Sequence, residues 1–199
     1  MSDAALSREH ILEAAEEVLR RYGPVKTTVV DVARALGVSH GTVYRHFASK
    51  AALRDAVAER WLARINAPLE AIAAEDGPAT VRLRRWLDQL ITAKQDRARD
   101  DPELFAAYVA LAAEARAVIR THVEHLRAQV ARIIADGVAQ GEFAAIDPTV
   151  AGRAVCDATS HFHDPANVAQ WKDPDFNARF EGVWMLIRAG LCAGSAKAE

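Results

Sequence analysis

The chain has few cysteines and no long hydrophobic run, and both absences narrow what it can be. Its two cysteines, Cys156 and Cys192, lie far apart in apolar helical stretches, where a reduced buried thiol is commoner than a disulfide. No run of 18 apolar residues is present, and the first residues lack the basic segment followed by an apolar one that begins a secretory signal. We therefore expect a cytoplasmic protein without a membrane partner.

Residue patterns typical of enzymes are also scarce. The chain has no nucleophile beside a base and no glycine-rich phosphate loop, so we expect no catalytic residue and no cofactor. Two groups, His122 with His125 and Asp157 with His161 and His163, have residue types that bind metals. Histidines near helix ends also simply bond the last carbonyls or a nearby acid. We assign no metal site, but whether these groups bind a metal or a ligand stays open, and a catalytic role in an enzyme is the alternative.

Strand signals are nearly absent, whereas helical periodicity runs along most of the chain. Hydrophobic residues make up 51% of the sequence, which is ample for a core, and 199 residues allow one large or two small domains. Prolines and glycines stand mostly at segment boundaries, and Pro68 alone predicts a kink or a break in a long helix. The pattern predicts an all-α protein of about nine helices, with domains at residues 1–55 and 56–199.

Residues 28–53 predict two short helices joined by a turn, followed by a third helix. Thr28 and Ser39 each precede a short apolar-periodic run, where a side-chain oxygen caps exposed backbone N–H groups. Gly37 follows the first helix, at a position where a residue without Cβ adopts a left-handed conformation at little cost. Val43 and Phe47 share one face of the second helix. This is the layout of a helix-turn-helix DNA reader.

The opposite face of the second helix has hydroxyls, imidazoles, a guanidinium and an aromatic ring but no carboxylate. Such side chains suit phosphates and base edges. Gly41 costs about 1 kcal/mol of helix stability relative to alanine, which suggests a close approach by DNA. Lys50 lies in the first turn of the third helix, where a phosphate is favoured. The polar face consists of His40, Gly41, Thr42, Tyr44, Arg45 and His46.

Positive charge is concentrated on the same stretch. Residues 20–60 hold eight lysines and arginines against three acids, a balance of +5, whereas the whole chain has a formal charge of −2. A neutral or acidic protein with one basic patch is typical of a DNA binder with a separate regulatory domain. The alternative is an interaction module whose basic patch binds an acidic protein.

The run T-V-Y-x-H-F-x-S-K-x-x-L at residues 42–53, preceded by L-G-V-S at 36–39, resembles the N-terminal domain of the TetR (tetracycline repressor) family of transcriptional regulators. The resemblance covers about residues 7–55. It implies a three-helix DNA-binding domain and a helical C-terminal domain for ligand binding and dimerisation. It also implies a homodimer that leaves a palindromic operator when a small-molecule effector binds, with repression as the commoner mode.

Carried over position by position, the resemblance gives roles to the polar residues. Ser39 to Thr42 begin the recognition helix, and His40 takes a position that often reaches a base edge. Tyr44 and Lys50 resemble phosphate anchors. The complete set of DNA contacts that we predict is Thr28, Ser39, His40, Gly41, Thr42, Tyr44, Arg45, His46 and Lys50.

Two C-terminal helical segments predict the dimer interface. The segment that begins at Asp147 carries small residues at four-residue spacing, which let another helix approach closely. The last helix is apolar on more than one side, so one side covers its own core and the other meets a second subunit. A monomer with one fully buried helix is the alternative. The predicted interface residues are Val150, Ala154, Ala158, Phe180, Trp184, Ile187 and Leu191.

The effector site is expected among the remaining aromatic and polar residues of the C-terminal domain. Small-molecule sites are lined mainly by apolar and aromatic side chains with a few polar groups. These helices carry no dense charged cluster, which favours a neutral or modestly polar organic compound over a polyanion. The candidates, each of which also fits plain core, are Trp86, Phe105, Tyr108, His125, Cys156, Phe162 and Trp171.

Overall fold

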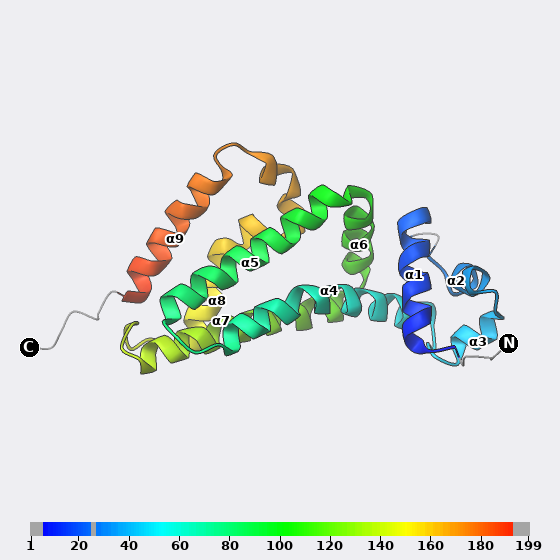
Figure 1. Cartoon of the computed structure of the whole chain (residues 1–199), viewed down its shortest axis with the longest axis horizontal. Helices are drawn as coiled ribbons and strands as arrows, with labels where there is room; N and C mark the ends of the chain where they lie inside the picture. Colours follow the sequence, from blue (N-terminus) through cyan, green and yellow to red (C-terminus); the bar gives the residue numbers. More distant parts are fainter. Residues whose placement is uncertain (1–5, 25–26, 193–199) are drawn as a thin grey trace, which may run out of the picture. The chain divides into compact units, whose positions relative to one another are not determined.

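The computed structural model describes residues 6–24 and 27–192, and these residues form helices joined by short connections (Figure 1). The described ranges contain no strand, so the all-α prediction is confirmed. The elements are α1 (Arg8–Tyr22), α2 (Val29–Leu36), α3 (His40–Tyr44), α4 (Lys50–Ala74), α5 (Ala79–Asp100), α6 (Pro102–Glu114), α7 (Arg116–Ala139), α8 (Pro148–His163), the 3-10 helix η2 (Pro165–Lys172) and α9 (Phe176–Cys192).

The chain divides into two compact units. The first combines Met1–Ala63 with Asp100–Arg120, and the second combines Arg64–Arg99 with Thr121–Glu199. Helix α4 therefore contributes residues to both units. Pro68 lies inside this helix and does not divide it, contrary to one of the two outcomes that the sequence predicts. No helix of the described residues is both long enough and apolar enough to cross a membrane.

The first helices begin and end where their capping residues predict. The Ser7 hydroxyl accepts a hydrogen bond from the backbone N–H of His10, 3.2 Å away, and Gly23 ends α1 with a φ of 73°. Thr28 caps α2, and Gly37 ends it in the left-handed conformation with a φ of 67°. Because the conformation at Gly37 disfavours any side chain, this glycine fixes the turn between α2 and α3.

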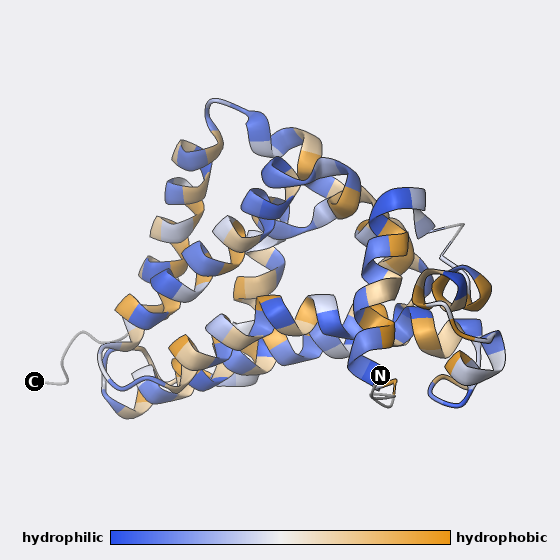
Figure 2. Cartoon of the chain, turned by 45° about the vertical axis from the view of Figure 1, so that its right-hand side comes forward, coloured by the Kyte–Doolittle hydropathy of each residue, from blue (hydrophilic) through white to orange (hydrophobic). Residues whose placement is uncertain are grey.

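A small hydrophobic core holds the three N-terminal helices and the start of α4. Hydrophobic residues alternate with hydrophilic ones along each helix (Figure 2), and Ile11, Val32, Val43 and Phe47 are buried. At the edge of this core, the Arg60 guanidinium on α4 pairs with three carboxylates of α1, from Glu9, Glu13 and Glu16. The unit thus fixes α3 through apolar contacts and leaves its polar face free.

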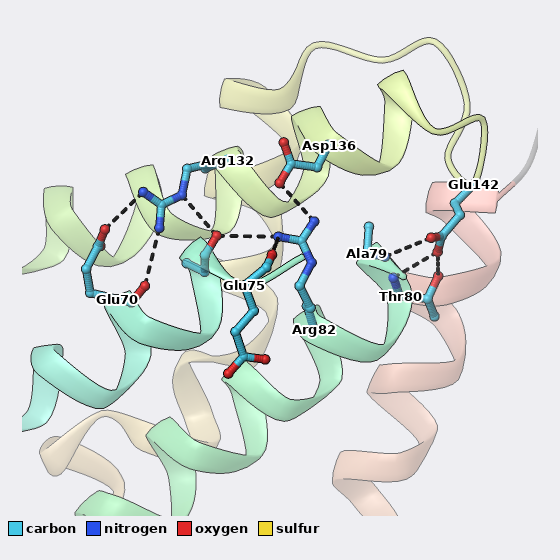
Figure 3. A network of polar contacts seen from close by, with 9 residues as sticks. Glu70, Glu75, Ala79, Thr80, Arg82, Arg132, Asp136 and Glu142 are labelled. Carbon is cyan, nitrogen blue, oxygen red and sulfur yellow. Dashed lines mark hydrogen bonds and ion pairs between the residues drawn. The ribbon is translucent and has the colours of Figure 1, made fainter. Parts of the chain in front are cut away.

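In the second unit, a polar network holds together the end of α4, the start of α5 and the end of α7 (Figure 3). The Glu142 carboxylate accepts hydrogen bonds from the backbone N–H groups of Ala79 and Thr80, at 2.8 and 3.0 Å. These are unpaired donors of the first turn of α5. Arg82 and Arg132 donate hydrogen bonds to a backbone carbonyl at the C-terminal end of the preceding helix, α4. The network therefore supplies hydrogen-bond partners both to the first N–H groups of α5 and to the last carbonyls of α4.

Candidate functional site

The start of α3 is ordered by a chain of hydroxyl contacts. The Ser39 hydroxyl accepts a hydrogen bond from the backbone N–H of Thr42 at 3.2 Å, and the two hydroxyl oxygens lie 3.0 Å apart. The Arg45 guanidinium donates to the Thr42 hydroxyl at 3.3 Å. These contacts orient the Arg45 side chain along the helix surface.

Burial separates the residues that hold α3 from those that can meet another molecule. Val43 and Phe47 are buried, and the Arg8 guanidinium lies 4.8 Å from the centre of the Phe47 ring. The ring edge of His40 meets Tyr44, with 6.4 Å between ring centres. All the predicted contact residues of this face are exposed except Thr42, which is half-buried. The exposed ones are His40, Gly41, Tyr44, Arg45, His46 and Lys50.

Gly41 has no role that the protein itself explains. A Cβ built at this position would meet only the Ser39 hydroxyl oxygen, at 3.7 Å, which is ordinary van der Waals contact. Its φ is not positive, so the backbone does not require a glycine. A close approach by DNA therefore remains the prediction for this residue.

Thr28 is engaged mainly within its own helix. Its hydroxyl accepts a hydrogen bond from the backbone N–H of Asp31 and donates one to the carboxylate of the same residue. The hydrogen bond from Thr28 and the nearby charge of Arg34 hold the pKa of Asp31 below its ordinary value. The capping role is confirmed, and the DNA contact that the resemblance implies for Thr28 stays a prediction.

The predicted ligand residues fall into two groups. Phe105 and Tyr108 belong to the first unit, where both pack against Trp61 of α4. The Tyr108 ring is stacked on Trp61 with 4.7 Å between ring centres and 5° between ring planes. These two residues are therefore core residues of the first unit in this structure. The other five candidates belong to the second unit.

Most of those five are buried. Trp86 donates a hydrogen bond from its indole nitrogen to the Gln129 amide oxygen at 3.0 Å, and burial raises the pKa of Cys156 to about 12. Trp171 and Phe162 are buried as well. His125, by contrast, is exposed.

Three buried polar residues of the second unit lie outside the predicted pocket lining: Lys94, which sequence reasoning missed, and His122 and His163, whose ligand binding the sequence left open. Lys94, His122 and His163 come from α5, α7 and α8, and each is at least nine-tenths buried. The sequence did carry a signal for the lysine, because Leu87, Leu90 and Lys94 recur at helical spacing on the apolar face of α5. The charged residues that follow Lys94 in the sequence mask this signal.

The predicted dimer-interface residues differ in exposure. Val150, Ala154 and Ala158 of α8 are exposed, whereas Ile187 is half-buried. The other three, Phe180, Trp184 and Leu191, are buried within one chain. The Arg84 guanidinium covers two of them, at 5.0 Å from the Phe180 ring and 5.7 Å from the Trp184 ring.

The large hydrophobic side chains that α9 does expose lie outside the predicted stripe. They are Met185 and Leu186, with exposed fractions of 65% and 75%. The main apolar face of α9 therefore packs into the core of its own chain, and Met185 and Leu186 are the large hydrophobic side chains that this helix exposes.

These features define an all-α protein with an N-terminal helix-turn-helix DNA-binding domain. The family model described as "Tetracyclin repressor-like, C-terminal domain" matches residues 79–184, and the model described as "Bacterial regulatory proteins, tetR family" matches residues 11–57. The chain therefore belongs to the TetR family of bacterial regulatory proteins.

Known proteins resemble the chain in part or throughout. The HTH-type transcriptional regulator TtgR of Pseudomonas putida is 40% identical over 55 residues, which cover 28% of this chain and only 26% of that relative. The structure of SmeT, the repressor of the Stenotrophomonas maltophilia multidrug efflux pump SmeDEF, has a TM-score of 0.69 at 18% identity and covers 94% of this chain and 91% of SmeT.

A second similar structure contains a ligand. The transcriptional regulator FadR from Bacillus subtilis, in complex with stearoyl-CoA, has a TM-score of 0.63 at 19% identity, over 92% of this chain and 99% of FadR. At these identities, the two structures show the fold that they share with this chain.

Proposed function

We propose that the protein is a ligand-responsive repressor that binds a palindromic operator as a homodimer and is released by a small organic effector. The observation that carries the proposal is that α3 has a buried apolar side and an exposed polar side. Val43 and Phe47 fix the helix in the core, while a face without a carboxylate is exposed. Base edges and phosphates are the partners that such a face fits. Such a protein acts in the cytoplasm, where the operator lies.

The effector is proposed to bind in the second unit, which lies outside the helix-turn-helix. SmeT, a similar structure, represses an efflux pump, and FadR, another, is known in complex with stearoyl-CoA. Helix α4 runs from Lys50, beside the recognition helix in sequence, to Ala74 in the second unit. A ligand that moves the end of this helix can therefore also move its first residues, which directly follow the recognition helix in the chain.

The homodimer is proposed to form through the exposed parts of α8 and α9. Val150, Met185 and Leu186 supply exposed apolar surface, and Ala154 and Ala158 allow close approach. A two-fold dimer places its two recognition helices about one turn of DNA apart, roughly 34–36 Å.

The proposal is tested with the full chain and the DNA upstream of its own coding region. We expect a protected palindrome, bound tightly, and weaker binding of random duplex that decreases steeply with salt because counterions are released. If the chain binds random and upstream DNA equally at every salt concentration, it is not a sequence-specific regulator. A basic patch that serves an acidic protein would give that result.

Variants of the polar face separate phosphate contacts from base contacts. Tyr44→Phe and Lys50→Ala are expected to weaken binding to all sequences, whereas His40→Ala is expected to change which sequence is preferred. Lys172→Ala is the matched control, because Lys172 is an exposed lysine at the end of η2. If His40→Ala leaves the relative affinities of single-base operator variants unchanged, its base-reading role is wrong.

A further inference from the structure

The second unit contains three buried groups with polar or positive side chains. Lys94, His122 and His163 have exposed fractions of only 6%, 5% and 9%. They come from three different helices, α5, α7 and α8, and the charge of Lys94 acts on both imidazoles. Packing therefore brings together residues that are far apart in the sequence. Burying a charged ammonium costs several kcal/mol unless an acceptor compensates it.

The partners of these groups within the described residues compensate them only in part. Both ring nitrogens of His122 lack a hydrogen-bond partner. The Thr159 hydroxyl donates to the Val155 carbonyl at 2.8 Å, so towards the His163 Nε2, 3.4 Å away, it can only accept a long hydrogen bond. A buried imidazole without any partner is rare, because each unpaired polar group costs free energy.

The carboxylate that acts on Lys94 is outside the buried part of the cluster. Asp164 raises the pKa of the ammonium, but its side chain is exposed and accepts a hydrogen bond from the backbone N–H of Ala166 at 2.9 Å. Within the part of the chain that the structure describes, no ion pair joins the two residues. Lys94 thus has an attractive charge nearby but no buried acceptor.

The protonation states follow from burial. Burial lowers the pKa of Lys94 to about 8, so most of its ammonium groups are charged at neutral pH. Burial, together with the Lys94 charge, lowers the pKa of His122 and of His163 to about 3. Both imidazoles are therefore neutral, and each has one N–H group to donate. The cluster combines one positive charge with two neutral donors.

We infer that Lys94, His122 and His163 bind the anionic head of the effector, and that this head is a single carboxylate on an apolar body. The inference rests on the proposed function, since it names the chemistry of the ligand in that regulator. One buried cation matches one negative charge, whereas a polyanion would leave uncompensated charge. The apolar body is matched by Leu90 and Ile91, which are buried one turn before Lys94 on α5.

A metal ion is the other ligand that two imidazoles could hold, and the structure does not favour it. The described residues contain no group of three or more His, Cys, Asp or Glu residues that could hold a metal. A charged ammonium beside the two imidazoles repels a cation and attracts an anion. The same three residues that disfavour a metal therefore favour a carboxylate.

The test compares carboxylates with their uncharged amides on the full chain. The probes are butanoate, octanoate, dodecanoate, benzoate and phenylacetate, each beside its primary amide, with the melting temperature as the readout at pH 7. At least one carboxylate is expected to raise the melting temperature with increasing concentration, because it binds only the folded state. Its amide is expected to bind at least tenfold more weakly, since it lacks the charge.

Substitutions then assign the binding to the cluster. In Lys94→Met, which removes a buried charge and keeps the chain length, the carboxylate is expected to bind no more tightly than its amide. His122→Leu is expected to weaken the carboxylate by about tenfold, the loss of one hydrogen bond. Lys172→Met changes an exposed lysine of the same unit and is expected to leave binding unchanged.

A second readout distinguishes a ligand-binding lysine from a structural one. The pKa of Lys94, followed by the NMR signal of its terminal methylene, is expected to rise when the carboxylate binds, because the anion favours the charged form. A lysine that only fills the core would keep the same pKa with and without the probe.

Four results would overturn the inference. The first three are a panel in which no carboxylate raises the melting temperature, equal binding of acid and amide, and wild-type carboxylate binding by Lys94→Met. The fourth is a stabilisation by inorganic phosphate equal to that by the best carboxylate. Operator binding is measured separately without probes: its failure refutes the regulatory function and leaves the carboxylate site standing, whereas intact operator binding with no carboxylate binding refutes the site alone.

Discussion

The Arg82 guanidinium on α5 donates a hydrogen bond to the backbone carbonyl of Glu75, 2.7 Å away and one residue beyond the end of α4 (Figure 3). Its second nitrogen donates to the Asp136 carboxylate on α7 at 2.8 Å. The last carbonyls of a helix have no partner within the helix, so a side chain that binds them fixes where the helix ends. Arg82 thereby ties the end of α4 to both α5 and α7.

Replacing Arg82 by methionine should destabilise the protein strongly. The side chain is almost fully buried, and its loss leaves carbonyl and carboxylate oxygens without their donor. We expect Arg82→Met to lower the free energy of unfolding by about 2–4 kcal/mol, measured by urea titration with circular dichroism. The matched control is Arg85→Met, which removes an exposed partner of Glu75 and should change stability little. Similar losses in the two variants would contradict the role of Arg82.

The helix ends of the DNA-binding domain could be predicted because capping is local. Thr28 and Gly37 bound α2 through contacts within four residues of each. The buried cluster could not be predicted in the same way, since Lys94 and His163 meet only after α5 and α8 pack. His122 and His125 look alike in sequence, yet one is buried and the other is exposed. Helical spacing predicts which residues share a face, but only packing determines which face is covered.

Gly41→Ala should separate stability from DNA binding. Alanine fits the space around Gly41 and favours the helix. The free energy of unfolding should therefore stay the same or rise by up to about 1 kcal/mol, and the melting temperature should not fall. If DNA approaches the backbone here, the added methyl group should weaken operator binding at least tenfold. Thermal melting and a DNA gel-shift titration measure the two effects. Unchanged operator affinity would show that DNA does not approach this residue closely.

Leu186→Glu should disrupt the proposed homodimer. Leu186 is 75% exposed on α9, so the charge is tolerated in a single chain but not in an apolar interface between subunits. We expect a shift from dimer to monomer at micromolar concentration, measured by light scattering after gel filtration, with the helical content retained. Val81→Glu, at an exposed position of α5, is the control and should remain dimeric. If Leu186→Glu stays dimeric, Leu186 is not part of the interface.

The buried imidazoles predict a specific sensitivity to acid. Folding lowers the pKa of His122 and of His163 from 6.5 to about 3, through burial and the charge of Lys94. Between pH 6.5 and pH 3, the unfolded chain therefore binds more protons than the folded one, and stability falls as the pH falls. Each buried imidazole contributes a slope of at most about 1.4 kcal/mol per pH unit in this window.

His122→Leu should remove one such contribution. Titrations with urea at pH 7, 6, 5 and 4.5 should give a free energy of unfolding that falls less steeply with acid than in the wild type. The control is His125→Leu, at an exposed position one turn away on α7, which leaves both buried imidazoles in place and should keep the wild-type slope. Since Lys94 and His163 remain beside position 122, the variant tests this imidazole alone. Equal slopes in wild type and His122→Leu would mean that His122 becomes protonated as readily in the folded protein as in the unfolded chain.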